Sequence, residues 1–83
     1  MWYQIYRQYK EGKITFEEIN IRCEFYHVSS EDRMQIFIWL YKYKRVTKEE
    51  FKQHVIDGCI TPEEYEQITG EEYIDNSEDT QDN

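Results

Sequence analysis

Two pairs of cysteine and histidine are the residues in this sequence whose types could bind a metal. Cys23 stands four residues before His27, and His54 stands five residues before Cys59. Zinc accepts two cysteines and two histidines as ligands, but neither pair has the close C-x-x-C spacing of a strong zinc motif. We therefore treat these four residues as weak metal candidates and expect no cofactor. The cysteines allow one disulfide, although free thiols in a reducing cytoplasm are the favoured interpretation.

Three pairs of adjacent glutamates could serve as paired catalytic carboxylates, and a threonine precedes each pair. The pairs are Glu17-Glu18, Glu49-Glu50 and Glu63-Glu64, and the threonines are Thr15, Thr47 and Thr61. A threonine followed three residues later by a glutamate forms a capping box, in which each side chain accepts a hydrogen bond from the backbone N–H of the other residue. Negative charge is also favourable in the first helical turn. The spacing therefore predicts helix starts, and we expect no enzyme.

Start and stop signals of this kind divide the chain into about five short helices. The predicted caps are Thr15, Ser29, Thr47 and Thr61, and the predicted stops are Gly12, Gly58 and Gly70. Apolar spacing predicts a first helix over residues 1–9 and a third helix from Ser29 to about Lys44. No stretch alternates as a strand would. The predicted fold class is all-α, a small helical bundle.

The sequence also contains an internal repeat. Residues 9–36 align without a gap on residues 41–68, at an offset of 32 residues, and the two caps in each copy are 14 residues apart. Boundary signals and apolar positions match together, as when Thr15 meets Thr47 and Ile36 meets Ile68. A shared step of this kind predicts a duplicated helical hairpin. We expect one helical domain over residues 1–73, built from two related hairpins.

Charge is concentrated at the C-terminal end of the chain. The net charge is −8, but residues 71–83 hold six of the 18 acidic residues and no basic residue. We expect residues 74–83 to form a disordered acidic tail. Residues 1–70 carry 12 acids against 10 bases, which disfavours binding to nucleic acid and weakens the case for an acidic mimic of DNA. The apolar run over residues 34–41 is too short to span a membrane.

The third predicted helix and the aromatic residues indicate a surface for protein contact. This helix is apolar on nearly all sides, so it should be enclosed, and a folded body of about 70 residues has little core to enclose it. The chain also has eight tyrosines, a residue type that suits both contact surfaces and half-wet cores. We expect the contact surface at Trp2, Tyr6, Phe37, Trp39, Tyr41 and Tyr43.

The C-terminal half of the chain carries a set of motifs in a fixed order. They are an aromatic residue (Trp39), a cap (Thr47), a valine before a glycine (Val55 and Gly58), the turn Ile60-Thr61-Pro62-Glu63-Glu64-Tyr65 and the ending Ile68-Thr69-Gly70-Glu71-Glu72-Tyr73. Over residues 39–73 this set resembles the XkdX family, small proteins of phages and prophages. The turn is also similar to a bihelical SHOCT-type oligomerisation motif, which likewise implies protein–protein contact. The family's motif residues look like caps and turns, so no functional site transfers from it.

The resemblance implies a gene from the tail and baseplate region of a tailed phage or prophage. It leads us to expect a non-catalytic, tail- or baseplate-associated accessory or structural protein. Its partners would be tail or baseplate proteins or a second copy of itself. It would work in the host bacterial cytoplasm during assembly and then in the virion tail. The alternative is a small acidic phage regulator that binds and inhibits a host protein.

Overall fold

The computed structural model describes residues 2–74, which form five helices and no strand. The helices are α1 (Trp2–Lys10), α2 (Phe16–Phe25), α3 (Ser30–Lys42), α4 (Lys48–Ile56) and α5 (Pro62–Thr69). The predicted all-α class is therefore confirmed. The predicted acidic tail lies outside the described residues except for Ile74, which is exposed.

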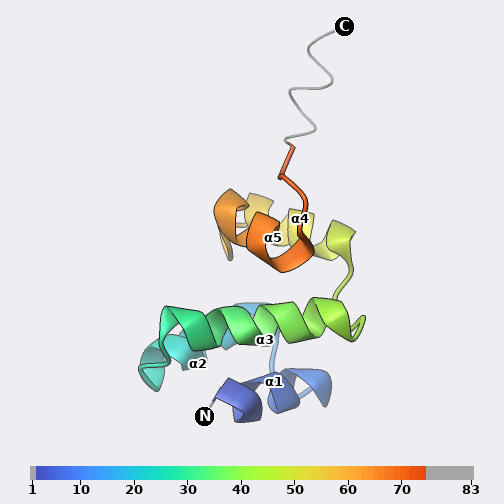
Figure 1. Cartoon of the computed structure of the whole chain (residues 1–83). Coiled ribbons are helices and arrows are strands. Elements are labelled where there is room, and N and C mark those ends of the chain that lie inside the picture. The colour runs from blue at the N-terminus through green and yellow to red at the C-terminus, as the bar shows by residue number, and fades with distance from the viewer. Residues whose placement is uncertain (1, 75–83) are drawn as a thin grey trace, which may run out of the picture.

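Helix α3 crosses the middle of the molecule, with α1 on one side of it and the α4–α5 pair on the other (Figure 1). One continuous core follows this arrangement and receives buried side chains from every helix. Its fully buried members include Ile19, Phe37, Leu40 and Phe51. No polar or charged residue among residues 2–74 is buried. Apolar burial therefore holds the helices together, as it does in most small domains.

Each predicted cap begins a helix where the sequence places it. Thr15, Thr47 and Thr61 form complete capping boxes with Glu18, Glu50 and Glu64, and Ser29 accepts from the backbone N–H of Asp32. The threonine N–H groups lie 2.7, 2.7 and 2.9 Å from the glutamate Oε1 atoms. Each cap satisfies backbone N–H groups that a helix start otherwise leaves without partners.

One turn conformation recurs three times in the chain. A residue with positive φ ends the preceding helix, a second residue follows, a buried apolar residue comes next, and a threonine cap opens the next helix. The three turns are Gly12-Lys13-Ile14-Thr15, Lys44-Arg45-Val46-Thr47 and Gly58-Cys59-Ile60-Thr61. In the last of them Gly58 donates to the carbonyl of Val55 and Cys59 to that of His54, which is the Schellman pattern. The buried apolar residue pins each turn to the core.

The turn between α2 and α3 is one residue shorter than the other three. His27 adopts the positive φ there, and only Val28 separates it from the cap Ser29. The repeat places the α2–α3 turn opposite the α4–α5 turn, so the two hairpins share their helix starts but not this turn. The duplication and the domain bounds stay predictions. Helix α3 ends at Lys42 rather than near Lys44, because Lys44 takes the left-handed conformation at φ 61°.

Helix α3 is enclosed by its own chain more completely than its composition predicts. Ile36, Phe37 and Leu40 are buried, and every other large apolar residue of the helix is at least half-buried. Its neighbours α1 and α5 cover it from two sides. The expectation that α3 leaves an apolar face for a partner is therefore wrong, and the exposed apolar surface lies elsewhere.

Candidate functional site

The four weak metal candidates do not come together. Cys23 lies in the core, His27 is exposed in the α2–α3 turn, and only His54 and Cys59 line the same hollow. Among residues 2–74, no three histidine, cysteine, aspartate or glutamate side chains are grouped so that they could hold a metal ion. Both cysteines are free thiols. The fold therefore keeps His54 and Cys59 in one hollow but does not bring the two pairs into one site.

The hollow that holds His54 and Cys59 has a volume of about 420 Å³ and opens between α2 and α4. Within it the His54 ring stacks on Phe16, with ring centres 3.6 Å apart, and its Nδ1 is buried without a partner among the described residues. Burial lowers the pKa of His54 and, helped by Glu17 and Asp57, raises the pKa of the Cys59 thiol. A raised thiol pKa makes a poor nucleophile, and no hydrogen bond joins the two side chains within residues 2–74. His54 and Cys59 therefore contribute to packing between the helices.

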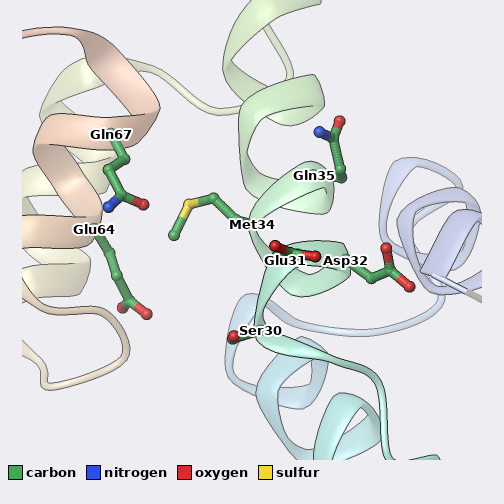
Figure 2. Close-up of a pocket in the computed structure, with 7 residues that line it drawn as sticks. All are labelled: Ser30, Glu31, Asp32, Met34, Gln35, Glu64 and Gln67. Carbon is green, nitrogen blue, oxygen red and sulfur yellow. The ribbon is translucent and has the colours of Figure 1, made fainter.

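A larger groove of about 640 Å³ separates the start of α3 from α5 (Figure 2). Met34 extends across it from α3 toward Gln67 and Glu64, whereas Asp32 and Gln35 point away from α5. Glu64 is already occupied, since one oxygen completes the Thr61 cap and the other pairs with Arg33. The carboxylates that line the groove therefore do not converge on a shared point where a substrate would react.

The predicted contact residues lie mostly between α1 and α3. Trp39 packs edge-to-face on Trp2 at 5.0 Å, on Tyr6 at 5.5 Å and on Tyr43 at 5.7 Å between ring centres. Aromatic pairs in this geometry add stability beyond the area they bury. Trp2 and Trp39 are half-buried and Tyr43 is half-exposed. This cluster fastens α1 to α3, so little of it is available to a partner.

Two of the predicted contact residues are in the core, which corrects the sequence expectation for them. Tyr6 and Phe37 are 4% and 0% exposed, because Tyr6 packs on Trp39 of α3 and Phe37 stacks on Phe16 of α2. Tyr41 is half-buried and packs on Phe51. The helical pattern of the sequence marks apolar faces but does not distinguish a face covered by the same chain from one left open.

Three neighbouring apolar side chains are exposed on α2, and Tyr3, Tyr43, Ile56 and Ile74 are exposed elsewhere. Ile21 and Phe25 are 58% and 73% exposed, and Tyr26 beside them is 44% exposed. Glu18 and Arg22 occupy the same side of the helix, and together these five residues line a shallow hollow of about 260 Å³. We call Glu18, Ile21, Arg22 and Phe25 the α2 stripe. At 100° per residue the stripe lies opposite the buried side formed by Phe16, Ile19 and Cys23.

Sequence reasoning missed the α2 stripe, although the repeat contains a signal for it. At the offset of 32 residues Ile21 aligns with Gln53 and Phe25 with Asp57. On α4 those residues are exposed and polar, and Gln53 Nε2 donates to Asp57 Oδ1 at 3.0 Å. The α4 residues at these two positions are therefore polar, although Ile56 beside them is 67% exposed.

Comparison with known proteins places part of the chain in a family. Residues 39–73 match the family model described as "Phage uncharacterised protein (Phage_XkdX)". Residues 39–73 are thus similar to the XkdX family, and we call them the XkdX segment. The resemblance seen in the sequence is therefore confirmed, and the chain is a phage or prophage protein. The XkdX segment includes the last turn of α3, both helices α4 and α5, and the four residues that follow α5.

A prophage protein matches a stretch of similar length. The protein named "SPbeta prophage-derived uncharacterized protein YomP" of Bacillus subtilis (strain 168) is 54% identical over 33 residues, which cover 40% of this chain and 52% of that protein. The chain thus spans about half the length of the curated relative it matches. No solved structure matches the chain. Within residues 2–74, no helix combines the length and apolar character needed to cross a membrane.

The structure gives the XkdX motif residues structural roles. Gly70 ends α5 in the left-handed conformation, and Thr69 Oγ1 donates to the carbonyl of Tyr65. Beyond the glycine, Glu71 pairs with Lys48 at 2.8 Å and the Tyr73 ring packs on Tyr65. The ending of the motif therefore clips the chain back onto α5 and the start of α4. The prediction that these residues serve as caps and turns is confirmed.

Proposed function

We propose that this chain is a non-catalytic accessory or structural protein of a phage tail or baseplate, which acts by protein–protein contact. The observation that carries the proposal is the exposed α2 stripe, where Ile21 and Phe25 are more than half exposed. Burying large apolar side chains of this kind on a partner releases them from water and favours association. The phage origin of the XkdX segment supports the assignment to a phage structure.

The state of the titratable groups supports a non-catalytic role. Glu18, Glu50 and Glu64 are engaged in helix caps. Burial raises the pKa of the Cys23 thiol, and that of Cys59 is raised as well. A site for chemistry needs a nucleophile or base with an activating neighbour and room for substrate, and these groups serve packing and capping instead.

The place of action follows from the same proposal. The protein would meet its partner in the host bacterial cytoplasm while the tail is assembled and would stay in, or leave, the finished virion tail. Aromatic side chains such as Phe25, next to an arginine such as Arg22, are the residue types that dominate protein interfaces. Tail or baseplate subunits and a second copy of this chain are the partners we propose.

A pair of surface variants in the phage or prophage tests this function. Phe25→Asp places a charge on the α2 stripe, and Ile56→Asp places the same charge on α4 at a residue that is 67% exposed. Both variants should fold. After induction, tailed particles are counted by electron microscopy, infectious titre is measured, and purified virions are analysed by mass spectrometry. We expect Phe25→Asp to lower the titre at least about tenfold with fewer tailed particles, and Ile56→Asp to match the wild type.

Equal titres for the two variants would overturn the role of the α2 stripe in assembly. Normal tailed particles from a phage that lacks the gene, combined with a loss of effect on the host, would favour the small acidic regulator instead. In that case the Phe25→Asp variant should no longer bind the host protein.

A further inference from the structure

We propose that the acidic C-terminal segment, residues 75–83, binds by charge to a basic patch on its own chain and shields that patch from other acidic proteins. The patch extends from the end of α3 to the middle of α4 and holds half of the ten basic residues of the chain: Lys42, Lys44, Arg45, Lys48 and Lys52. It shares no residue with the α2 stripe, so the inference goes beyond the proposed function.

The basic patch carries more positive charge than its surroundings neutralise. Four of its five bases, all except Lys48, form no ion pair with any of residues 2–74. Residues 42–52 contain two acids, Glu49 and Glu50, and one oxygen of Glu50 is engaged in the cap of α4. Five bases against two acids leave a net charge of +3 over this stretch. Lys42 and Lys44 are exposed, as is the arginine that follows them.

The other five bases offer no comparable surface. Three of them already pair with carboxylates of the bundle, as Arg7 and Lys13 do with Glu11 at 3.3 Å. The remaining two, Lys10 and Arg22, lie on different helices. Within residues 2–74, only the basic patch therefore presents several positive charges without partners to one acidic segment.

The chain leaves the bundle beside this patch. Glu71 pairs with Lys48 at 2.8 Å. The hydrogen bond and charge of Lys48, together with the charge of Lys52, hold the pKa of Glu71 below its ordinary value. Two residues later the Tyr73 ring packs on Tyr65. The acidic end of the chain therefore already contacts the patch before the described residues end at position 74.

The length and charge of residues 75–83 suit the rest of the patch. They contain four acids, Asp75, Glu78, Asp79 and Asp82, and no base. Nine extended residues reach at most about 30 Å, which is ample to pass from α4 to the α3–α4 turn. A hollow of about 390 Å³ at that turn, lined by both exposed lysines, provides room for carboxylates.

Attachment to the same chain makes these contacts effective. Exposed ion pairs are individually weak and are screened by salt. A tethered segment, however, acts at an effective concentration in the millimolar range. We therefore expect a contact that forms at low ionic strength and is lost at high ionic strength. A separate acidic protein would have to displace the segment before it could bind the patch.

The first test compares amide NMR spectra of the full 83-residue chain with those of a charge-neutral variant. This variant carries Asp75→Asn, Glu78→Gln, Asp79→Asn and Asp82→Asn and leaves residues 1–74 unchanged. In about 20 mM salt the two spectra should differ at residues 42–52, and in about 500 mM salt the difference should vanish. Equal spectra over residues 42–52 at low salt, or changes as large on α1, would overturn the inference.

Two lysines give matched variants for the same comparison. Lys44 and Lys10 are both exposed and without an ion pair among residues 2–74. Lys44→Gln should reduce the spectral difference between the acidic and charge-neutral segments, whereas Lys10→Gln should leave it unchanged. Equal effects of the two substitutions would mean that the segment responds to overall charge and not to the patch.

Chemical crosslinking identifies the contact directly. A carbodiimide joins a lysine amine to a carboxylate that touches it, and the Lys48–Glu71 pair provides a control in the same sample. Mass spectrometry of mixed isotope-labelled and unlabelled chains should find Lys42 or Lys44 joined to a carboxylate of residues 75–83 within one chain. The Lys48–Glu71 product without such links, or links only between chains, would contradict the proposal.

Binding of poly-L-glutamate tests the shielding. If the segment occupies the patch in about four-fifths of the molecules, the charge-neutral variant should bind this probe about fivefold more tightly than the wild type. Adding Lys44→Gln to the variant should remove most of the gain, and adding Lys10→Gln should keep it. Equal affinities of wild type and charge-neutral variant would show that the segment does not shield the patch.

Discussion

Arg33 on α3 and Glu64 on α5 form a half-buried ion pair that joins the two halves of the bundle. The Arg33 guanidinium also donates to Asn20 Oδ1 at 2.7 Å and to the carbonyl oxygen of Cys59 at 3.1 Å. Glu64 meanwhile completes the Thr61 capping box. One side chain therefore fastens α2, α3 and the α4–α5 turn together.

Replacing Arg33 should show how much this junction stabilises the fold. Arg33→Met removes three hydrogen bonds and leaves Glu64 without its partner, so the free energy of unfolding should fall by about 2–3 kcal/mol. Arg33→Lys should recover little, because an ammonium group lacks the planar fork that reaches separate acceptors. Urea denaturation measures the effect. Arg45→Met, at an exposed residue, is the control, and an equal loss in both variants would contradict the account.

Lys44 gives a prediction of increased stability. Its φ of 61° is left-handed, where two of the other three turns use glycine. The conformation costs a residue with a side chain about 1–2 kcal/mol. Glycine avoids this cost, but its more flexible unfolded chain cancels part of the gain in stability. Lys44→Gly should therefore raise the free energy of unfolding by about 0.5–1 kcal/mol.

The reverse change at Gly58 provides the matched comparison. A Cβ at Gly58 would meet no atom within 4 Å, so any effect of Gly58→Ala reports backbone conformation alone. We expect a loss of about 1 kcal/mol in thermal or urea unfolding. Unchanged stability in both variants would show that the left-handed turns are not strained for ordinary residues.

The helix starts could be predicted from the sequence more accurately than the helix ends. The caps at Thr15, Ser29, Thr47 and Thr61 were predictable because a cap is a local arrangement of side chain and backbone within four residues. The end of α3 was less predictable, because an apolar run through Tyr43 masks the point at which Lys44 turns the chain.

The exposed surface was the least predictable part of the site. Tyr6 and Phe25 are both aromatic residues at helical spacing, yet one is buried and the other is 73% exposed. Their difference depends on which helices pack over them, and packing between helices is not a local property of the sequence. The Arg33–Glu64 pair, 31 residues apart in the chain, could not be predicted for the same reason.

Tyr73 should contribute to stability although it follows the last helix. Its ring packs edge-to-face on Tyr65 with 5.4 Å between ring centres. Tyr73→Ala should lower the free energy of unfolding by about 1–2 kcal/mol, measured by thermal denaturation. Glu71→Gln, which removes the exposed pair with Lys48, should leave the midpoint unchanged. A larger effect at Glu71 than at Tyr73 would mean that charge rather than packing holds this end.

His54 predicts a dependence of stability on pH. Burial lowers its pKa below the ordinary value of 6.5, and the nearby Asp57 and Glu50 oppose this shift only in part. As the pH falls through about 6.5, the unfolded chain therefore binds a proton at His54 more readily than the folded chain does. This difference favours the unfolded state at acidic pH. Stability should be full at pH 7.5 and lower near pH 5.5, before most carboxylates titrate.

The measurement is the thermal midpoint at these two pH values for the wild type and for His54→Leu. The midpoint of the wild type should fall on acidification, and that of the variant should change less because the titrating ring is gone. An equal fall in both proteins would assign the dependence to other groups.

The central claim is that the α2 stripe is the working surface of this phage protein. The most direct measurement places a photo-crosslinking amino acid at position 25, and in a second strain at position 56, in cells that are producing phage. Irradiation should give products at position 25, identified by mass spectrometry as a second copy of this chain or a tail protein of the same phage, and none at position 56. Equal products at both positions, or none at position 25 while particles assemble normally, would contradict the account.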